Sequence, residues 1–230
     1  MDDKFNKWNK WIDVILSEIT RLSIDRNIFW EVQEIIKNNP KIQKPSKFYN
    51  FLRNIYTASA LMGVRKQVKI DKDSISFARL LQEICDTPKI LSKKRFFANY
   101  KGSTVEKIAK LMESTVEEFE SRNFDQFVGK TVNYVDPELI ELDLKKLKLE
   151  AQKCEEYADR RVAHFDKKVI CNIPTYEELD SCIDYLEILM KKYYLLFRAS
   201  HLNSILPVSQ DKYDWKAIFK EVWIHKLNQN

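Results

Sequence analysis

The sequence predicts an all-α protein: a single domain over residues 1–230, built as a helical bundle with long antiparallel helices. The chain contains only three glycines, whereas hairpin-rich β proteins use glycine repeatedly in turns with positive φ. Apolar residues recur at steps of three and four along most of the chain, which is the period of an amphipathic helix. Hydrophobic residues make up 44% of the chain, so a substantial core is expected and disorder is not.

The N-terminal part, about residues 1–45, is predicted to form helices that pack on a core bundle. Apolar side chains follow a helical period over residues 4–22. Ser23 or Asp25 is expected to cap a second helix, which ends before Pro40.

The core bundle, about residues 46–200, is predicted to begin with a helix that follows a proline and a serine cap and ends near Val68. Asp73 or Ser74 is expected to cap the next helix, which ends before Pro88. Both helices carry an apolar stripe that faces the interior of the bundle.

A helix capped at Ser103 or Thr104 precedes the best candidate for a domain boundary, residues 123–137. This link contains Gly129 and Pro137, which favour a break in the helices. It is short and carries aromatic residues, so we expect a packed loop and not a flexible linker.

Two long helices follow and are expected to pack antiparallel, because only about ten residues join them. The first begins at Asp136 and runs to about residue 166. The second begins at a capping box formed by Thr175 and Glu178 and runs to about Ser200. The stretch DKYDWKAIFKEVWIHKL predicts a short C-terminal helix. The apolar set expected on the first long helix comprises Leu139, Leu142, Leu147, Leu149 and Ala158.

Charge and cysteine content leave the class of partner open. The net charge of +5 comes from 39 basic and 34 acidic residues spread along the chain, which permits contact with a phosphate backbone but does not argue for it. The four cysteines show no metal-binding or disulfide-framework spacing, so neither a metal nor a cofactor is expected. The chain lacks a signal-peptide pattern and a run of about eighteen apolar residues, which predicts a cytoplasmic protein without a membrane span.

Aromatic and basic residues offer two candidate surfaces. Aromatic residues at helical spacing are more often core or dimer interface than a base-stacking surface, and here they comprise Trp8, Trp11, Trp30, Phe48, Tyr49, Phe51 and Tyr56. The stretch KKRFFANYK, residues 93–101, is the best local patch that combines both types. Lys93, Lys94 and Arg95 are therefore candidate RNA-binding residues.

The stretch YADRRVAHFDKK, residues 157–168, has the highest density of chemically useful side chains. Residues three and four apart share a helix face, so His164 is expected beside Arg160 and Arg161. His164 is then a candidate general base, the arginines a phosphate clamp, and Asp159 an orienting carboxylate. Such a set is sufficient for metal-free RNA cleavage, in which the ribose 2′-OH attacks its own phosphodiester. The alternative is a solvated polar face near a helix end.

Three stretches resemble the abortive-infection U-type branch of the HEPN superfamily. They are ALMGVRKQVKIDKDSISFARLLQEI (residues 60–84), KILSKKRFF after it, and YADRRVAHFD followed by PTYEELDSCIDYLEILMKKYY. Together they cover roughly residues 50–198. The resemblance implies a helical bundle that commonly dimerises, with two copies of its signature around one cleft. It also implies a metal-independent endoribonuclease of toxin–antitoxin or phage-defence systems.

The family signature is an arginine followed by four to six residues and a histidine, and the histidine carries over to His164. Arg160 lies closer to His164 than the signature requires. Arg65 is a further candidate, expected to approach from another helix. The positions where the family has its arginine hold Tyr157, Ala158 and Asp159.

Two hypotheses follow. The first is an HEPN-like endoribonuclease or RNA-binding defence protein that acts as a homodimer, alone or with an antitoxin or another defence partner. The second is a non-catalytic helical interaction or regulatory protein with a degenerate motif. A catalytic His164 is expected to open onto a basic cleft, preferably across a two-fold axis. A His164 closed off by salt bridges to Asp159 or Asp166 favours the second hypothesis.

Overall fold

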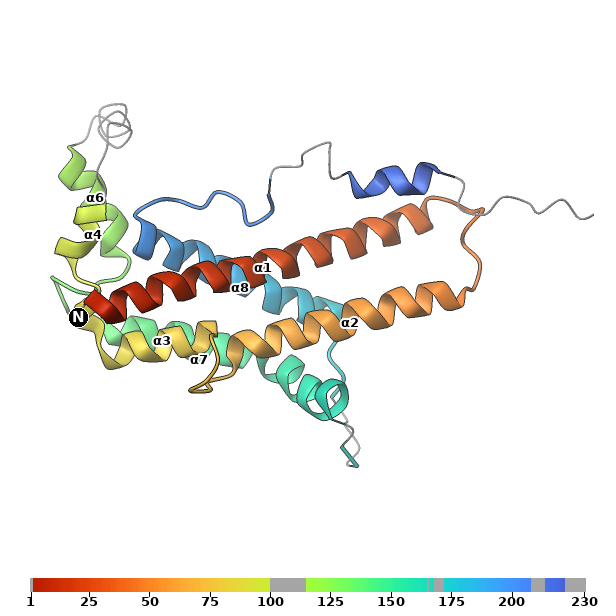
Figure 1. Cartoon of the computed structure of the whole chain (residues 1–230), viewed down its shortest axis with the longest axis horizontal. Coiled ribbons are helices and arrows are strands. Elements are labelled where there is room, and N and C mark those ends of the chain that lie inside the picture. Colours follow the sequence, from red (N-terminus) through yellow and green to blue (C-terminus); the bar gives the residue numbers. More distant parts are fainter. Residues whose placement is uncertain (1, 100–114, 165, 168–171, 208–213, 222–230) are drawn as a thin grey trace, which may run out of the picture.

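The protein is a helical bundle in the computed structural model, which describes residues 2–99, 115–164, 166–167, 172–207 and 214–221 (Figure 1). Over these residues there is no strand, and one isolated β-bridge joins Ser92 to Tyr134. The predicted all-α class is therefore confirmed. No described helix is both long and apolar enough to cross a membrane.

Long helices run back and forth along the bundle, and α1 and α2 are antiparallel, as are α7 and α8 (Figure 1). Short helices α4 and α6 lie together at the end of the bundle where α1 begins (Figure 1). The elements, in order, are α1 (Asp2–Lys37), α2 (Lys47–Val68), α3 (Phe77–Asp86), the 3₁₀ turn η1 (Pro88–Ile90), α4 (Lys93–Asn99), α6 (Val116–Asp125), α7 (Pro137–Tyr157), the π-helical turn η2 (Ala158–Ala163), α8 (Tyr176–Arg198) and the 3₁₀ turn η4 (Trp215–Lys220).

The N-terminal part forms one continuous helix, so the prediction of a break at Ser23 or Asp25 was wrong. Ser23 is buried in the bundle, and its hydroxyl lies 3.0 Å from the Ile19 carbonyl oxygen and 2.6 Å from a Glu187 carboxylate oxygen. A serine in the middle of a helix that bonds to the preceding turn does not act as a helix N-cap. Because α1 packs against α8 and α2, it belongs to the bundle itself.

Helix starts agree with the sequence where the capping residue is local. Ser46 caps α2, and Thr175 forms the predicted capping box with Glu178 at the start of α8. The prediction of Asp73 or Ser74 as the cap of α3 was wrong. The cap is Ser76, whose hydroxyl accepts a hydrogen bond from the backbone N–H of Arg79. The predicted caps Ser103 and Thr104 lie outside the described residues, as does most of the predicted C-terminal helix.

The link between α6 and α7 is packed against the bundle. Phe124, Phe127 and Val135 are fully buried. The Asp136 side chain caps α7 by accepting from the backbone N–H of Glu138 and also accepts from the backbone N–H of Lys130, at 2.9 and 2.7 Å. These bonds fold the link back onto the start of the helix.

The stripe that α7 buries only partly overlaps the predicted one. Leu147 and Ala158 are buried as predicted, and Leu139 is half-buried. Leu142 and Leu149 are 60% and 70% exposed. The buried residues are four and three positions apart, as one face of a helix requires. The predicted set instead contains spacings of five and two, which do not stay on one face. The buried set comprises Ile140, Leu144, Leu147, Ala151 and Cys154.

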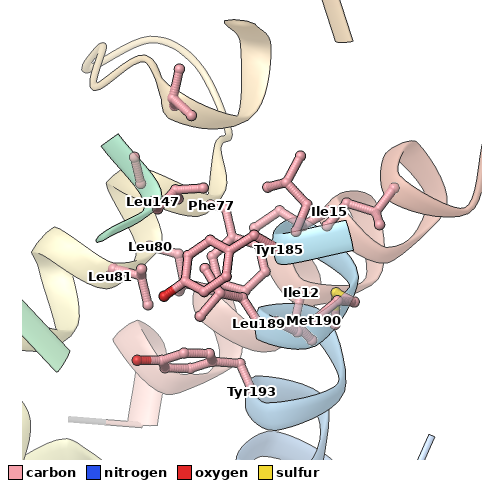
Figure 2. Close-up of a cluster of buried hydrophobic side chains, with 14 of the residues drawn as sticks. Ile12, Ile15, Phe77, Leu80, Leu81, Leu147, Tyr185, Leu189, Met190 and Tyr193 are labelled. Carbon is pink, nitrogen blue, oxygen red and sulfur yellow. The ribbon is translucent and has the colours of Figure 1, made fainter. Parts of the chain in front are cut away.

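The core forms where α1, α3, α7 and α8 converge (Figure 2). Tyr185, Leu189 and Tyr193 of α8 point into this cluster. The hydroxyl of Tyr193 donates to the Asp143 carboxylate at 2.8 Å, so its one polar atom is paired inside the core. The predicted aromatic residues divide, since Trp8, Trp11 and Tyr56 are buried while Trp30, Phe48 and Phe51 are exposed.

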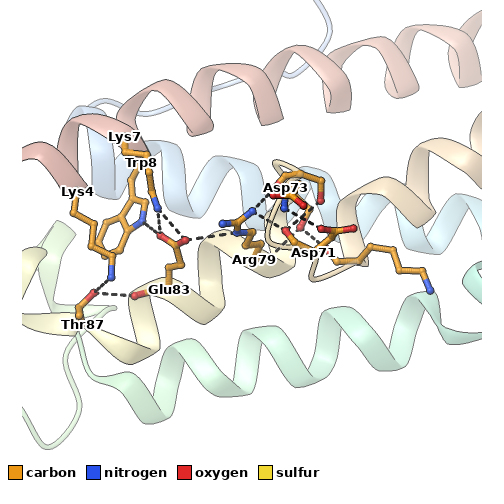
Figure 3. Close-up of polar contacts among 11 residues, drawn as sticks. Lys4, Lys7, Trp8, Asp71, Asp73, Arg79, Glu83 and Thr87 are labelled. Carbon is orange, nitrogen blue, oxygen red and sulfur yellow. Dashed lines mark hydrogen bonds and ion pairs between the residues drawn. The ribbon is translucent and has the colours of Figure 1, made fainter.

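A polar network fastens α3 to the start of α1 (Figure 3). The Glu83 carboxylate accepts from the indole N–H of Trp8 at 2.8 Å and from Lys7 at 2.9 Å. Burial alone would raise the pKa of Glu83, but the hydrogen bonds from Lys7 and Trp8 outweigh it and lower the pKa. The carboxylate therefore stays charged and holds the two helices together.

The core position of α8 can be tested with two isoleucines on the same helix. Ile183→Ala removes a fully buried side chain and is expected to lower the free energy of unfolding by about 2–5 kcal/mol. The matched control Ile188→Ala alters a side chain that is 59% exposed and should change it by less than about 0.5 kcal/mol. Equilibrium unfolding in urea measures both, and equal effects would contradict the packing described.

Candidate functional site

The stretch that carries the candidate residues changes its helical geometry. Helix α7 ends at Tyr157, and residues 158–163 form a π-helical turn, which is wider than an α-helix. His164 leaves this turn with extended backbone angles, φ −136° and ψ 154°. The predicted helix to about residue 166 was therefore too long. Single π-turns occur frequently at functional sites.

His164 is exposed and directly follows the turn that contains Arg160 and Arg161. The prediction placed all three on one α-helical face, but the turn is π-helical and His164 lies beyond it. The three residues are neighbours along the chain, while their relative orientation is set by the turn. His164 is thus open to solvent, but it is not among the residues that line the neighbouring pocket described below, so its exposure alone does not decide between the two hypotheses.

Asp159 is turned toward α2, where two cations hold it. Arg65 Nε contacts one carboxylate oxygen, and Lys69 Nζ lies 2.8 Å from the other. Lys69 also lies 2.8 Å from a Glu155 carboxylate oxygen. Arg65 thus reaches the turn from another helix, and there it pairs with Asp159. The cluster fastens the turn to α2.

These contacts change the ionisation of the carboxylate. Burial alone would raise the pKa of Asp159, but the hydrogen bonds from Lys69 and Arg65 outweigh it and hold the pKa below its ordinary value. The same bonds, from Asp159 and then Glu155, raise the pKa of Lys69. Both charges are therefore present throughout the neutral pH range.

The two arginines of the turn are held differently. Arg160 Nη2 lies 3.0 Å from a Glu156 carboxylate oxygen. The side chain of Arg160 is 39% exposed and that of Glu156 is 44% exposed. Such a surface pair contributes little stability and exchanges readily with a phosphate. Arg161 Nη1 donates to the Asp166 carbonyl oxygen at 3.1 Å, and the Asp166 N–H donates to the Arg160 carbonyl at 2.9 Å. These two bonds close the chain around the turn.

A pocket of about 780 Å³ lies beside the turn, between α2 and the start of α8. Arg161 reaches it from the turn, Tyr157 from the end of α7, and Arg53 from α2. Its remaining lining is mainly apolar, with Asn54, Thr57, Ala58, Leu61, Val162, Ile173, Pro174, Thr175, Tyr176, Glu177 and Leu179.

The candidate RNA-binding residues Lys93, Lys94 and Arg95 lie in α4, near the start of α1 and far from the turn (Figure 1). Lys93 donates to Ser121 at 2.8 Å, and Arg95 pairs with Asp2 at 2.8 Å. Their charged groups also lie over aromatic rings, at 5.4 Å from Phe97 and 4.4 Å from Phe5 respectively. Lys94 is exposed. Tyr100 and Lys101 lie outside the described residues.

The structure therefore separates the predicted residues into two groups. Arg65, Asp159, Arg160, Arg161 and His164 lie at or beside the turn, whereas the α4 residues do not. Among the described residues, no group of His, Cys, Asp and Glu is arranged to hold a metal ion. Sequence reasoning missed Arg53 and Tyr176, which no local motif connects with the turn.

Comparison of the chain with protein-family models, with curated proteins and with solved structures found no match.

The tie between the turn and α2 generates a pH-dependent prediction. Asp159→Asn removes the carboxylate shared by Arg65 and Lys69, and we expect it to lower the free energy of unfolding at pH 7 by about 1–3 kcal/mol. The pKa of Asp159 is depressed in the folded state, so its contribution is present above the unfolded pKa of about 3.9 and is lost as the pH falls through the folded pKa. The difference from wild type should therefore shrink in acid.

Urea unfolding from pH 7 down to pH 2.5 measures this difference. Glu150→Gln is the matched control, since Glu150 is exposed on α7 and an amide replaces a carboxylate there too. A difference between Asp159→Asn and wild type that stays constant over this range, or that equals the effect of the control, would argue against the tie.

Proposed function

We propose that this chain is an HEPN-like RNA-binding protein of a bacterial defence or toxin–antitoxin system. RNA phosphate binds at the π-helical turn, and His164 acts there as a general base for cleavage without a metal. The observation that carries this proposal is an exposed imidazole immediately after a turn with two arginines, beside a pocket of about 780 Å³.

The electrostatics of the turn support phosphate binding. On their own, Glu155, Glu156 and Asp159 outnumber Arg160 and Arg161 by one charge. Two cations pair with Asp159, namely Arg65 of α2 and Lys69, which directly follows α2. They reverse this balance to one net positive charge. The tie to α2 thus makes the turn a surface that attracts a phosphodiester.

The chemistry that this set of groups supports is transesterification within RNA. His164 takes the proton of a ribose 2′-OH, whose oxygen forms a bond to the adjacent phosphorus. The bond from phosphorus to the 5′-oxygen of the next nucleotide breaks, and that oxygen takes a proton from water. Arg160 and Arg161 stabilise the extra negative charge on the pentacoordinate phosphorus. The products are a 2′,3′-cyclic phosphate and a 5′-hydroxyl.

A second candidate function is binding without catalysis, in an interaction or regulatory protein. Ala158 occupies one of the positions where the resembled family carries its arginine, and it is fully buried. Asp159 occupies another and is held by α2. The arginine of the signature is therefore replaced by residues with structural roles. This favours a protein that keeps the binding surface but does not cleave RNA at a catalytic rate.

Cleavage separates the two candidates. Wild-type protein incubated with a mixed RNA pool in EDTA is expected to produce fragments ending in cyclic phosphate, and His164→Ala to reduce the rate at least about 100-fold, the usual contribution of a general base. His201→Ala is the matched control, since His201 is exposed and lies near Asn123 of α6, away from the turn. Circular dichroism must show that all three proteins are folded. Equal rates for His164→Ala and His201→Ala would exclude the catalytic role.

RNA affinity as a function of salt tests which surface binds. Arg160→Gln is expected to weaken binding several-fold and to reduce the slope of log K against log salt by about one contact. Lys94→Gln removes an exposed cation on α4, so it is expected to leave both quantities unchanged. If only Lys94→Gln weakened RNA binding, the RNA-binding surface would lie on α4 and not at the turn.

A further inference from the structure

The pocket beside the turn has the size and lining of a ligand site. Its volume of about 780 Å³ lies within the usual range for pockets that take small molecules, roughly 300–1,000 Å³. We infer that it is a subsite for one nucleotide of single-stranded RNA, with the base inside the pocket and its phosphate at the turn. This inference rests on the proposed function and specifies the form of RNA that the protein takes.

The lining provides the two surfaces that an unpaired base requires. Leu61, Val162 and Leu179 form apolar walls, and the rings of Tyr157 and Tyr176 add flat aromatic surface. Stacking on such rings is a common and sequence-tolerant way of holding an unpaired base. A base in a duplex is stacked between its neighbours and paired along one edge, so it cannot enter a pocket of this kind.

One of the two rings is fixed before any ligand arrives. Tyr176 packs among the rings of Phe29, Trp30 and Tyr56, with centroid distances of 5.5, 5.6 and 6.3 Å. Its hydroxyl lies 3.3 Å from Thr57 Oγ1, a second side chain of the pocket wall. A ring held on several sides loses little freedom when a base stacks on it.

The charges of the pocket match a nucleotide. Arg53 and Arg161 are its two cationic side chains among the described lining residues, and Glu177 is its one acid. Arg53 is exposed, and its Nη2 donates to Asn50 at 3.1 Å, a contact that a phosphate replaces. Glu177 provides an acceptor for a ribose hydroxyl or a base amino group.

Arg161 connects the pocket with the turn. It lines the pocket and also donates to the Asp166 carbonyl, which closes the chain around residues 158–163. A base in the pocket therefore places its own phosphate, or the next one, at the turn that precedes His164.

Fluorescence anisotropy with a labelled eight-nucleotide single-stranded RNA, and with a duplex of the same length, tests the inference. Arg53→Gln and Tyr157→Leu are each expected to weaken binding of the single strand about tenfold. Two different substitutions are used because Tyr157 is partly buried against the core, whereas Arg53 is exposed. Arg21→Gln is the matched control, since Arg21 is an exposed arginine on α1 outside the pocket. The duplex should bind more weakly than the single strand.

The outcomes distinguish this inference from the proposed function. One outcome keeps the proposed function and overturns the subsite. In it, the wild type binds RNA and Arg160→Gln lowers the affinity, while Arg53→Gln and Tyr157→Leu have the same affinity as the control Arg21→Gln. Equal affinity for duplex and single strand also overturns the subsite. If wild-type protein in 100-fold excess over a nanomolar labelled RNA binds neither the single strand nor the duplex, both the proposed function and the subsite are overturned.

Photo-crosslinking provides a direct readout. The same RNA with a single 4-thiouridine is expected to crosslink to peptides that contain Tyr157 or Tyr176, as identified by mass spectrometry. Crosslinks confined to other peptides would place the base elsewhere and overturn the subsite.

Discussion

The burial of α8 is the interaction on which the rest of the structure depends. Eleven of its 23 residues are buried, and the helix contacts α1, α2, α4 and α7. Because α8 is covered on several sides, the positions of α1 and α7 follow from its side chains. The start of α8 at Thr175 also forms one wall of the pocket, so the packing that stabilises the bundle fixes the geometry of the candidate site.

Within that frame, the candidate site depends on charge. The turn extends a helix rich in acidic residues, and it becomes positive because Arg65 and Lys69 reach it from α2. The ion pairs that fasten the turn to α2 therefore also set the charge of the proposed binding surface. Loss of Arg65 and Lys69 would release the turn from α2 and also leave a negative charge where the proposed ligand is negative.

Local signals predicted most of the fold, and contacts between distant residues explain what they missed. The caps Ser46, Asp136 and Thr175 act within three residues and were predicted correctly. Ser23, predicted to cap a second helix, instead lies within α1 and bonds to Glu187, which is 164 residues away, so no window of sequence contains both. At the site, the 157–168 motif was visible locally, but its partner Arg65 is 94 residues from Asp159. The π-turn has no comparable sequence signal.

The pairing of the first helix with the last long one governs how the chain matures. Arg198 at the end of α8 bonds to Asn9 and Asp13 in α1, across 189 and 185 residues of sequence. During synthesis α1 emerges first, and the face that carries Ile12 and Ile15 remains without its partner until nearly the whole chain has been made. Completion of the bundle thus requires contacts between segments far apart in the sequence, which form more slowly than local ones.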